Sequence, residues 1–149
     1  MNFRMIGQVI GRVLCIEAAL PMVAALAYGE TPAPFLITIA ITGGIGLAMW
    51  RVRAKSGGMT ARDGFLIVGL SWIAMSLFGA LLFVLTGDIP NYIDALFETI
   101  SGLTTTGASV VTSPESMTRG GMFWRLFTHW IGGMGILVFV LAVLPMSGN

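Results

Sequence analysis

The chain has 149 residues, of which 56% are hydrophobic and 10% are charged, and its net charge at pH 7 is +1. A soluble domain carries about 25% charged residues, so this composition excludes an ordinary soluble domain and indicates an integral membrane protein. One cysteine and one histidine exclude a disulfide framework and a metal site built from Cys and His pairs.

The first apolar segment covers residues 5–28, which is long enough to span a bilayer, since a spanning helix takes about 20 residues. Arg4 and the small residues 25–27 resemble parts of a secretory signal. However, Arg12 and Glu17 interrupt the apolar stretch that such a signal needs. We therefore predict a retained transmembrane helix, in which Arg12 extends toward the interface and Glu17 meets a polar neighbour on another helix.

The next two apolar segments, residues 35–50 and 65–85, are separated by a basic loop. Positive charge concentrates on the cytoplasmic side of membrane proteins, so this loop and the N-terminus are predicted to lie inside a multi-pass plasma (inner) membrane protein. Residues 86–121 would then face outward, together with most of the acidic residues. The basic residues are Arg51, Arg53, Lys55 and Arg62, and the outer acidic residues are Glu30, Asp88, Asp94, Glu98 and Glu115. Trp50 and Trp124 lie near segment ends, where indole rings favour the interface.

A short helix is predicted at "YIDALFETISG", residues 92–102, following Asn91. At about 11 residues it would be about 16 Å long, too short to cross a hydrocarbon core of about 30 Å. Asp94 suits the positive end of its dipole, and Glu98 is placed to bond the backbone that follows or to attract cations. Its apolar residues recur at helical spacing on one face: Ile93, Leu96, Phe97 and Ile100.

"TTTGAS", residues 104–109, follows this helix directly. Irregular backbone at membrane depth is tolerated only where it is buried in protein or lines a water-filled cavity. A row of carbonyls that has lost its helical partners can be satisfied by a dehydrated monovalent cation, as in potassium filters. Gly107 permits a positive φ, and the β-branched threonines favour extended backbone. Such a cluster taken alone is an ordinary surface loop signal, but its place between a half-helix and an apolar span favours a pore loop.

The last apolar segment covers residues 122–145. Its glycines are predicted to let helices approach closely. Arg125 and His129 are four residues apart near its outer end, and we expect them to partner the outer carboxylates or a neighbouring repeat. The glycines are Gly132, Gly133 and Gly135.

The blocks "FLIVGLSWIAMSLFGALLFVLTGDIPNYIDALFETISGLTTTGAS" and "FWRLFTHWIGGMGILVFVLAVLP" resemble the Trk/Ktr potassium transporter family, in particular its TrkH-type membrane subunit. The resemblance implies an all-α integral membrane protein with two N-terminal transmembrane helices, residues 1–62, followed by one membrane helix–pore loop–membrane helix repeat, residues 63–149. Four such repeats would surround one potassium pathway.

The same resemblance implies which residues form the first repeat's share of a potassium filter. Backbone carbonyls would come from Thr105, Thr106, Gly107 and Ala108, flanked by Thr104 and Ser109. A serine at the glycine position accompanies sodium transport in plant relatives, so Gly107 favours potassium. Potassium would be the transported substrate, with no cofactor and no enzymatic reaction. The implied partners are the lipid bilayer and a cytosolic nucleotide-binding regulatory ring, with no nucleic acid.

Only one repeat of four is present, so further pore-loop repeats or a homo-oligomer would be needed to complete a pore. Two alternatives therefore stay open. The chain is either part of a potassium-uptake subunit or a truncated, non-conducting remnant with a structural or regulatory role. A third reading, an intramembrane hydrolase that uses Ser101 or Ser109 with His129, has no sequence pattern to orient the pair.

Overall fold

The computed structural model describes residues 3–52 and 61–143, and across these two ranges the chain is helical and contains no β-strand. The predicted all-α architecture is confirmed. The helices, in chain order, are α1 (Phe3–Tyr28), α2 (Ala33–Thr38), the π-helical η1 (Ile39–Gly43), α3 (Gly44–Trp50), α4 (Ala61–Thr86), α5 (Tyr92–Leu103), the 3₁₀ turn η2 (Pro114–Ser116) and α6 (Arg119–Val143).

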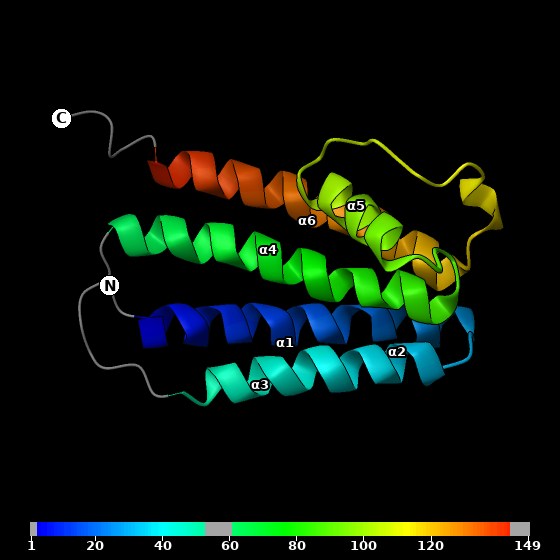
Figure 1. The fold of residues 1–149 in the computed structure, drawn as a ribbon, viewed down its shortest axis with the longest axis horizontal. Coiled ribbons are helices and arrows are strands. Elements are labelled where there is room, and N and C mark those ends of the chain that lie inside the picture. The colour runs from blue at the N-terminus through cyan, green and yellow to red at the C-terminus, as the bar shows by residue number, and fades with distance from the viewer. Residues whose placement is uncertain (1–2, 53–60, 144–149) are drawn as a thin grey trace.

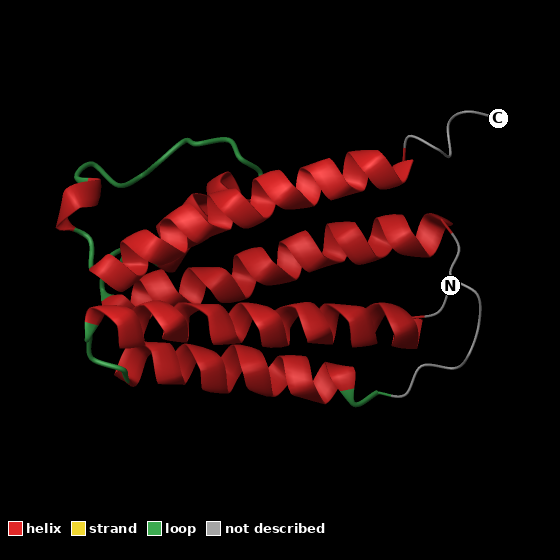
Figure 2. Cartoon of the chain, turned by 180° about the vertical axis from the view of Figure 1, so that it is seen from behind, coloured by secondary structure: helices red, strands yellow, loops and turns green. Residues whose placement is uncertain are grey.

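The long helices lie side by side and run up and down in turn (Figure 1). Helix α1 packs against α3 on one side and against α4 on the other, and α5 packs against both α4 and α6. The loops after α1 and α4 lie at one end of the bundle, which is the left end in Figure 2, and the loop after α5 runs from the middle of the bundle to that same end. The start of α1, the end of α3 and the start of α4 lie at the opposite end.

Within the described residues, three helices are long and apolar enough to cross a membrane, namely Phe3–Tyr28, Ala33–Trp50 and Arg62–Thr86. The second is a run of α2, η1 and α3 that reaches 18 residues. Helix α6 has 25 residues, which is long enough to span a bilayer. Over its described residues, however, it is not one of the three helices that combine this length with sufficient hydropathy. The chain is an all-α membrane protein.

The buried apolar side chains of the described residues form two clusters. One joins Ile6, Ile10 and Leu14 of α1 to α3 and α4. The other joins all the long helices near the end with the loops after α1 and α4, and includes Phe35, Phe83 and Trp124. Trp124 is only 1% exposed and donates from Nε1 to the Gly79 carbonyl at 3.0 Å. The prediction that Trp124 lies at the interface is therefore wrong, because its ring fills the centre of the bundle; Trp50 is 44% exposed.

Two acidic side chains fix the start of α6 at the loop-rich end. Asp88 accepts from the Thr118 amide and hydroxyl, both at 2.7 Å. Glu30, from the loop between α1 and α2, accepts from the Gly120 amide at 3.1 Å. Carboxylates suit the positive end of a helix dipole and its unpaired amides. The location of these two acids at this end of the bundle thus has a local structural reason.

The basic loop predicted to lie in the cytoplasm falls mostly outside the described residues, since Arg53 and Lys55 belong to residues 53–60. Its two described arginines, Arg51 and Arg62, are exposed. Arg51 follows α3 and Arg62 lies in the first turn of α4. These helix ends lie opposite the loops after α1 and α4 (Figure 1), which contain Glu30 and Asp88. The division of charge between the two ends is the one that the sequence predicts, while the side of the membrane stays a prediction.

Candidate pore-loop site

Helix α5 begins and ends close to the predicted bounds. The Asn91 side chain caps it by accepting from the Ile93 amide at 2.9 Å. Its 12 residues correspond to about 18 Å, so it cannot cross a bilayer. Its small and polar face is buried against α4 and α6, while the apolar residues Ile93, Phe97 and Ile100 are 67%, 46% and 42% exposed.

The chain leaves α5 through a tight reversal at Thr104–Thr106. The Thr105 amide donates to the Gly102 carbonyl and the Thr106 amide donates to the Ser101 carbonyl, both at 2.9 Å. This pair of bonds is the Schellman arrangement, which places the residue after the cap in the left-handed region. That residue is Thr105, with φ of 56°. Left-handed backbone in a β-branched residue is a strained conformation.

Residues 106–109 continue without regular structure, as the sequence predicts for "TTTGAS". Gly107 has φ of 76°, a conformation that glycine adopts without steric cost. The Thr104 and Thr106 hydroxyls contact each other at 2.7 Å. All residues from 104 to 110 are exposed in this chain. Both special backbone positions of the segment therefore lie inside the predicted filter.

The carbonyl oxygens of residues 104–107 receive no hydrogen bond from any described residue. The next carbonyl differs, because Ala108 accepts from the Ser101 hydroxyl. The Thr104 hydroxyl donates to the Ile100 carbonyl at 2.8 Å. The free row thus coincides with most of the predicted filter, and the Ala108 carbonyl is tied back to α5.

A buried ion pair braces the other side of the loop. Glu98 has a fully buried side chain, and its Oε1 lies 2.6 Å from Nε of Arg125 on α6. The same carboxylate accepts from the Ser109 hydroxyl and from the Val110 amide, each at 3.0 Å. A buried charge needs both a partner and hydrogen bonds, and Glu98 has both. The prediction that Glu98 bonds the backbone after α5 is confirmed, as is its pairing with Arg125.

The end of α5 is held by two further contacts. Trp72 of α4 donates from Nε1 to the Leu103 carbonyl at 3.0 Å. Gly132 of α6 lies so close to that carbonyl that a Cβ on it would overlap the oxygen. Gly135 lies against the Trp72 ring, where an added Cβ would come within 2.7 Å. Close packing by Gly132 and Gly135 is confirmed; an added Cβ on Gly133 would meet nothing nearer than 3.9 Å.

His129 takes a different partner from the one expected. Its Nδ1 lies 2.9 Å from the Arg125 carbonyl, so among the described residues it bonds its own helix and no carboxylate. The predicted alternative, a partner in a neighbouring repeat, stays a prediction. Ser101 and Ser109 bond Ala108 and Glu98, and neither pairs with His129 in the described structure. The hydrolase reading therefore has no geometric support. The roles of Trp72 and Ser101 were missed, because nothing in the local sequence shows which distant backbone atom a side chain reaches.

Comparison with known proteins identifies the sequence family. A family model described as TrkH, cation transport protein, matches residues 33–149. The Trk system potassium uptake protein TrkH of Salmonella typhimurium is 37% identical over 99% of this chain and 32% of its own length. The Trk system potassium uptake protein TrkG of Escherichia coli is 40% identical over 86% of this chain and 27% of its own. The chain thus spans about a third of the length of the curated relatives that it matches.

Proposed function

The chain belongs to the TrkH family of cation transport proteins, and from this premise we propose that it provides one part of a pathway for potassium uptake. Its relatives are named potassium uptake proteins. Uptake would proceed by selective permeation, in which filter carbonyls replace the hydration shell of the ion and the membrane potential draws the cation inward. No covalent chemistry is involved.

The observation that carries this proposal is the row of free carbonyls at residues 104–107, at the end of a helix too short to cross the membrane. Unpaired carbonyls at membrane depth cost free energy unless something satisfies them. The C-terminal end of α5 also carries a partial negative charge. Both features favour a cation beside this loop.

The filter residues in this proposal are Thr105, Thr106, Gly107 and Ala108, with Thr104 and Ser109 beside them. Thr105, Thr106 and Gly107 fit best, since their carbonyls have no donor among the described residues. The Ala108 carbonyl would share its second lone pair, because its first accepts from Ser101. Ser109 would position the loop, because its hydroxyl donates to Glu98.

The remaining parts of the proposal concern the division of the chain into regions, its membrane and its partners. Residues 1–62 would form an N-terminal membrane region and residues 63–149 the pore repeat, in a plasma (inner) membrane protein with a cytoplasmic N-terminus. A cytosolic nucleotide-binding regulatory ring would sit beneath the basic loop. Three further filter strands, from additional repeats or from further copies of the chain, would complete the coordination.

A second candidate function is that of a structural or regulatory membrane protein. One strand cannot surround a dehydrated ion, so a monomer with this single loop would not conduct. Oligomer size in mild detergent separates the two readings. A monomer that restores no potassium-limited growth supports the second, and a conducting assembly of this chain excludes it.

The filter assignment is tested by Gly107→Ser in a conducting form of the protein, in cells that lack their own potassium uptake. We expect a loss of selectivity for potassium over sodium. Gly87→Ser is the matched control, because Gly87 also has a positive φ, 82°, and open space around its Cα, but lies outside the loop. If both variants behave alike, the effect is one of backbone strain and the filter assignment is wrong.

A further inference from the structure

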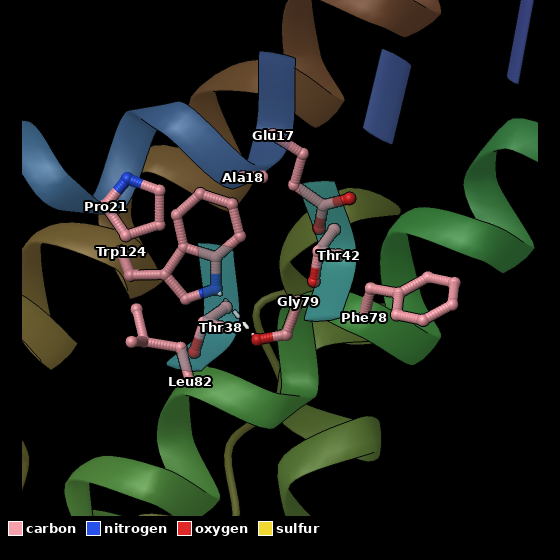
Figure 3. A pocket seen from close by; sticks show the side chains of 9 residues that line it. All are labelled: Glu17, Ala18, Pro21, Thr38, Thr42, Phe78, Gly79, Leu82 and Trp124. Carbon is pink, nitrogen blue, oxygen red and sulfur yellow. Dashed lines mark hydrogen bonds between the residues drawn. The ribbon is translucent and has the colours of Figure 1, made fainter. Parts of the chain in front are cut away.

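The cavity between the N-terminal helices and the pore repeat contains an acidic side chain that permeation does not use. Glu17 of α1 is 3% exposed, and its carboxyl group lies at the centre of this cavity (Figure 3). Helices α1, α2, α4 and α6 and the π-helical turn η1 all contribute to the wall. The lining residues are Glu17, Ala18, Pro21, Thr38, Thr42, Phe78, Gly79, Leu82 and Trp124.

Glu17 has no hydrogen-bond partner within the described part of the chain, at either carboxylate oxygen. The Thr42 hydroxyl, in the same cavity and 1% exposed, also lacks one. The predicted pairing of Glu17 with a polar neighbour is therefore not made, although a suitable neighbour is present. Thr42 lies in η1, Ile39–Gly43, and π-helical turns within α-helices occur frequently at functional sites.

The size of the cavity and the lack of charged residues in its wall limit which ligand Glu17 can bind. The cavity leaves no room for a water molecule, so a hydrated cation does not fit there. From α2 and η1 the site is faced by Thr38 and Thr42, from α4 by Phe78 and Gly79, and from α6 by Trp124, and none of these is charged. On α1 itself the nearest arginine, Arg12, is exposed and lies over Trp50, 5.8 Å from the ring centroid.

An ionised carboxylate in such a dry, uncharged site would cost much more free energy than a neutral carboxylic acid. Ionisable residues within membrane-spanning helices are for the same reason associated with ion or proton sites. A proton adds no volume, and it converts one carboxyl oxygen into a donor. The hydroxyl of Thr42 is the nearby group of matching chemistry. The packed arrangement is therefore the one in which Glu17 carries a proton.

This acid is also in contact with the residues that position the pore helix. A Cβ placed on Gly79 of α4 would lie 2.8 Å from Glu17 Oε1 and 3.1 Å from Cγ2 of Thr99 on α5. It would lie 3.2 Å from the Trp124 ring of α6, whose Nε1 already bonds the Gly79 carbonyl. Glu17 and the pore helix thus pack on the same glycine. A movement of the Glu17 carboxylate toward water would therefore change the packing at the point where α4 supports α5.

We propose that Glu17 is a proton-binding site, with the Thr42 hydroxyl beside it, and that loss of the proton loosens the packing of α4 against the pore helix. The proton site stands on the geometry of the cavity alone. Its effect on ion flux rests on the proposed function.

The proton is tested by infrared spectroscopy of the purified, intact protein in a detergent without ester groups. Near neutral pH, wild type is expected to show a carboxylic acid carbonyl band that Glu17→Gln loses. Glu17→Asp should shift the band, which guards against misfolding of the first variant, and Glu115→Gln, at an exposed acid outside the bundle, should leave it unchanged. If Glu17→Gln removes only carboxylate bands, Glu17 is ionised and the proposal is overturned.

The coupling is tested by potassium flux into vesicles as the pH is raised from neutral to alkaline. Wild type should lose flux, whereas Glu17→Gln, which is permanently neutral, should keep it. Equal pH dependence in both proteins would overturn the coupling. A wild-type protein without any flux would instead contradict the proposed function, and the infrared result would still decide the proton site.

Discussion

Thr105 is the residue at which local preference and the observed backbone disagree most clearly. Within residues 3–52 and 61–143 it is the one non-glycine residue with a positive φ. Glycine or asparagine usually takes this position after a helix. Strain of this kind persists only where the surrounding structure enforces it, and it is common at functional sites. Here the two Schellman bonds and the contact between the Thr104 and Thr106 hydroxyls enforce it.

Thr105→Gly should therefore stabilise the protein. Relief of left-handed strain is worth about 1–2 kcal/mol, and the added freedom of glycine in the unfolded chain offsets about 0.5–1 kcal/mol of it. The measurement is the free energy of unfolding in mixed micelles. Thr106→Gly is the control, because Thr106 has no positive φ and its replacement should only destabilise. Destabilisation by Thr105→Gly would contradict the strain argument.

Helix α5 illustrates which features of an element are local and which are not. Its bounds, predicted as 92–102 and observed as Tyr92–Leu103, follow from the Asn91 cap and the helical spacing of apolar residues. Its orientation does not. The predicted apolar face is largely exposed in this chain, while Glu98 and Thr99 are buried. That burial depends on Arg125 and on α4, which are distant in sequence, and no pattern within α5 encodes them.

The same difference between local features and long-range contacts applies to the loop after α5 and to the Glu17 cavity. The threonine–glycine loop was predictable from composition and position, but the left-handed Thr105 was not, since threonine disfavours that conformation. Glu17 was visible as an acid within an apolar segment. That its cavity is dry and is shared with Gly79 follows only from how the helices pack. The features that could not be predicted from the sequence therefore depend mostly on contacts between helices that are distant in the chain.

At the contact between α6 and α5, two adjacent glycines should respond in opposite ways to alanine. In Gly132→Ala the new methyl group would overlap the Leu103 carbonyl, which cannot move aside because Trp72 holds it. Overpacking of this kind costs about 1–3 kcal/mol, of which the gain in helix propensity that both variants share offsets about 1 kcal/mol. In Gly133→Ala the methyl group meets nothing nearer than 3.9 Å, and alanine gains about 1 kcal/mol in helix propensity.

Unfolding free energies of the two variants provide the comparison, with cation selectivity as a second readout for Gly132→Ala, since its clash lies directly before the filter loop. Equal stability of the two variants would mean that α6 does not approach α5 as closely as the structure places it.

For the whole molecule, the arrangement of charge predicts how the bundle sits in the bilayer. Arg51 and Arg62 belong to the end of α3 and the start of α4, at one end of the bundle. Glu30 and Asp88 belong to the loops at the other end and bond the start of α6. Basic residues next to spanning helices favour the cytoplasmic side. The acidic residues are held at their end by helix amides, so the charge asymmetry is built into the packing. The loop after α5 should therefore open to the outside.

This orientation is measured by thiol labelling in intact cells. On a Cys15→Ser background, which removes the only cysteine of the chain, Ser113→Cys should react with a membrane-impermeant reagent from outside. Val52→Cys should react only after the membrane is opened. Both positions are exposed, so accessibility within the protein does not decide the outcome. The two residues lie at opposite ends of the bundle. Labelling of Val52→Cys alone in intact cells would therefore show that the topology is the reverse of the predicted one, with the proposed filter loop open to the cytoplasm.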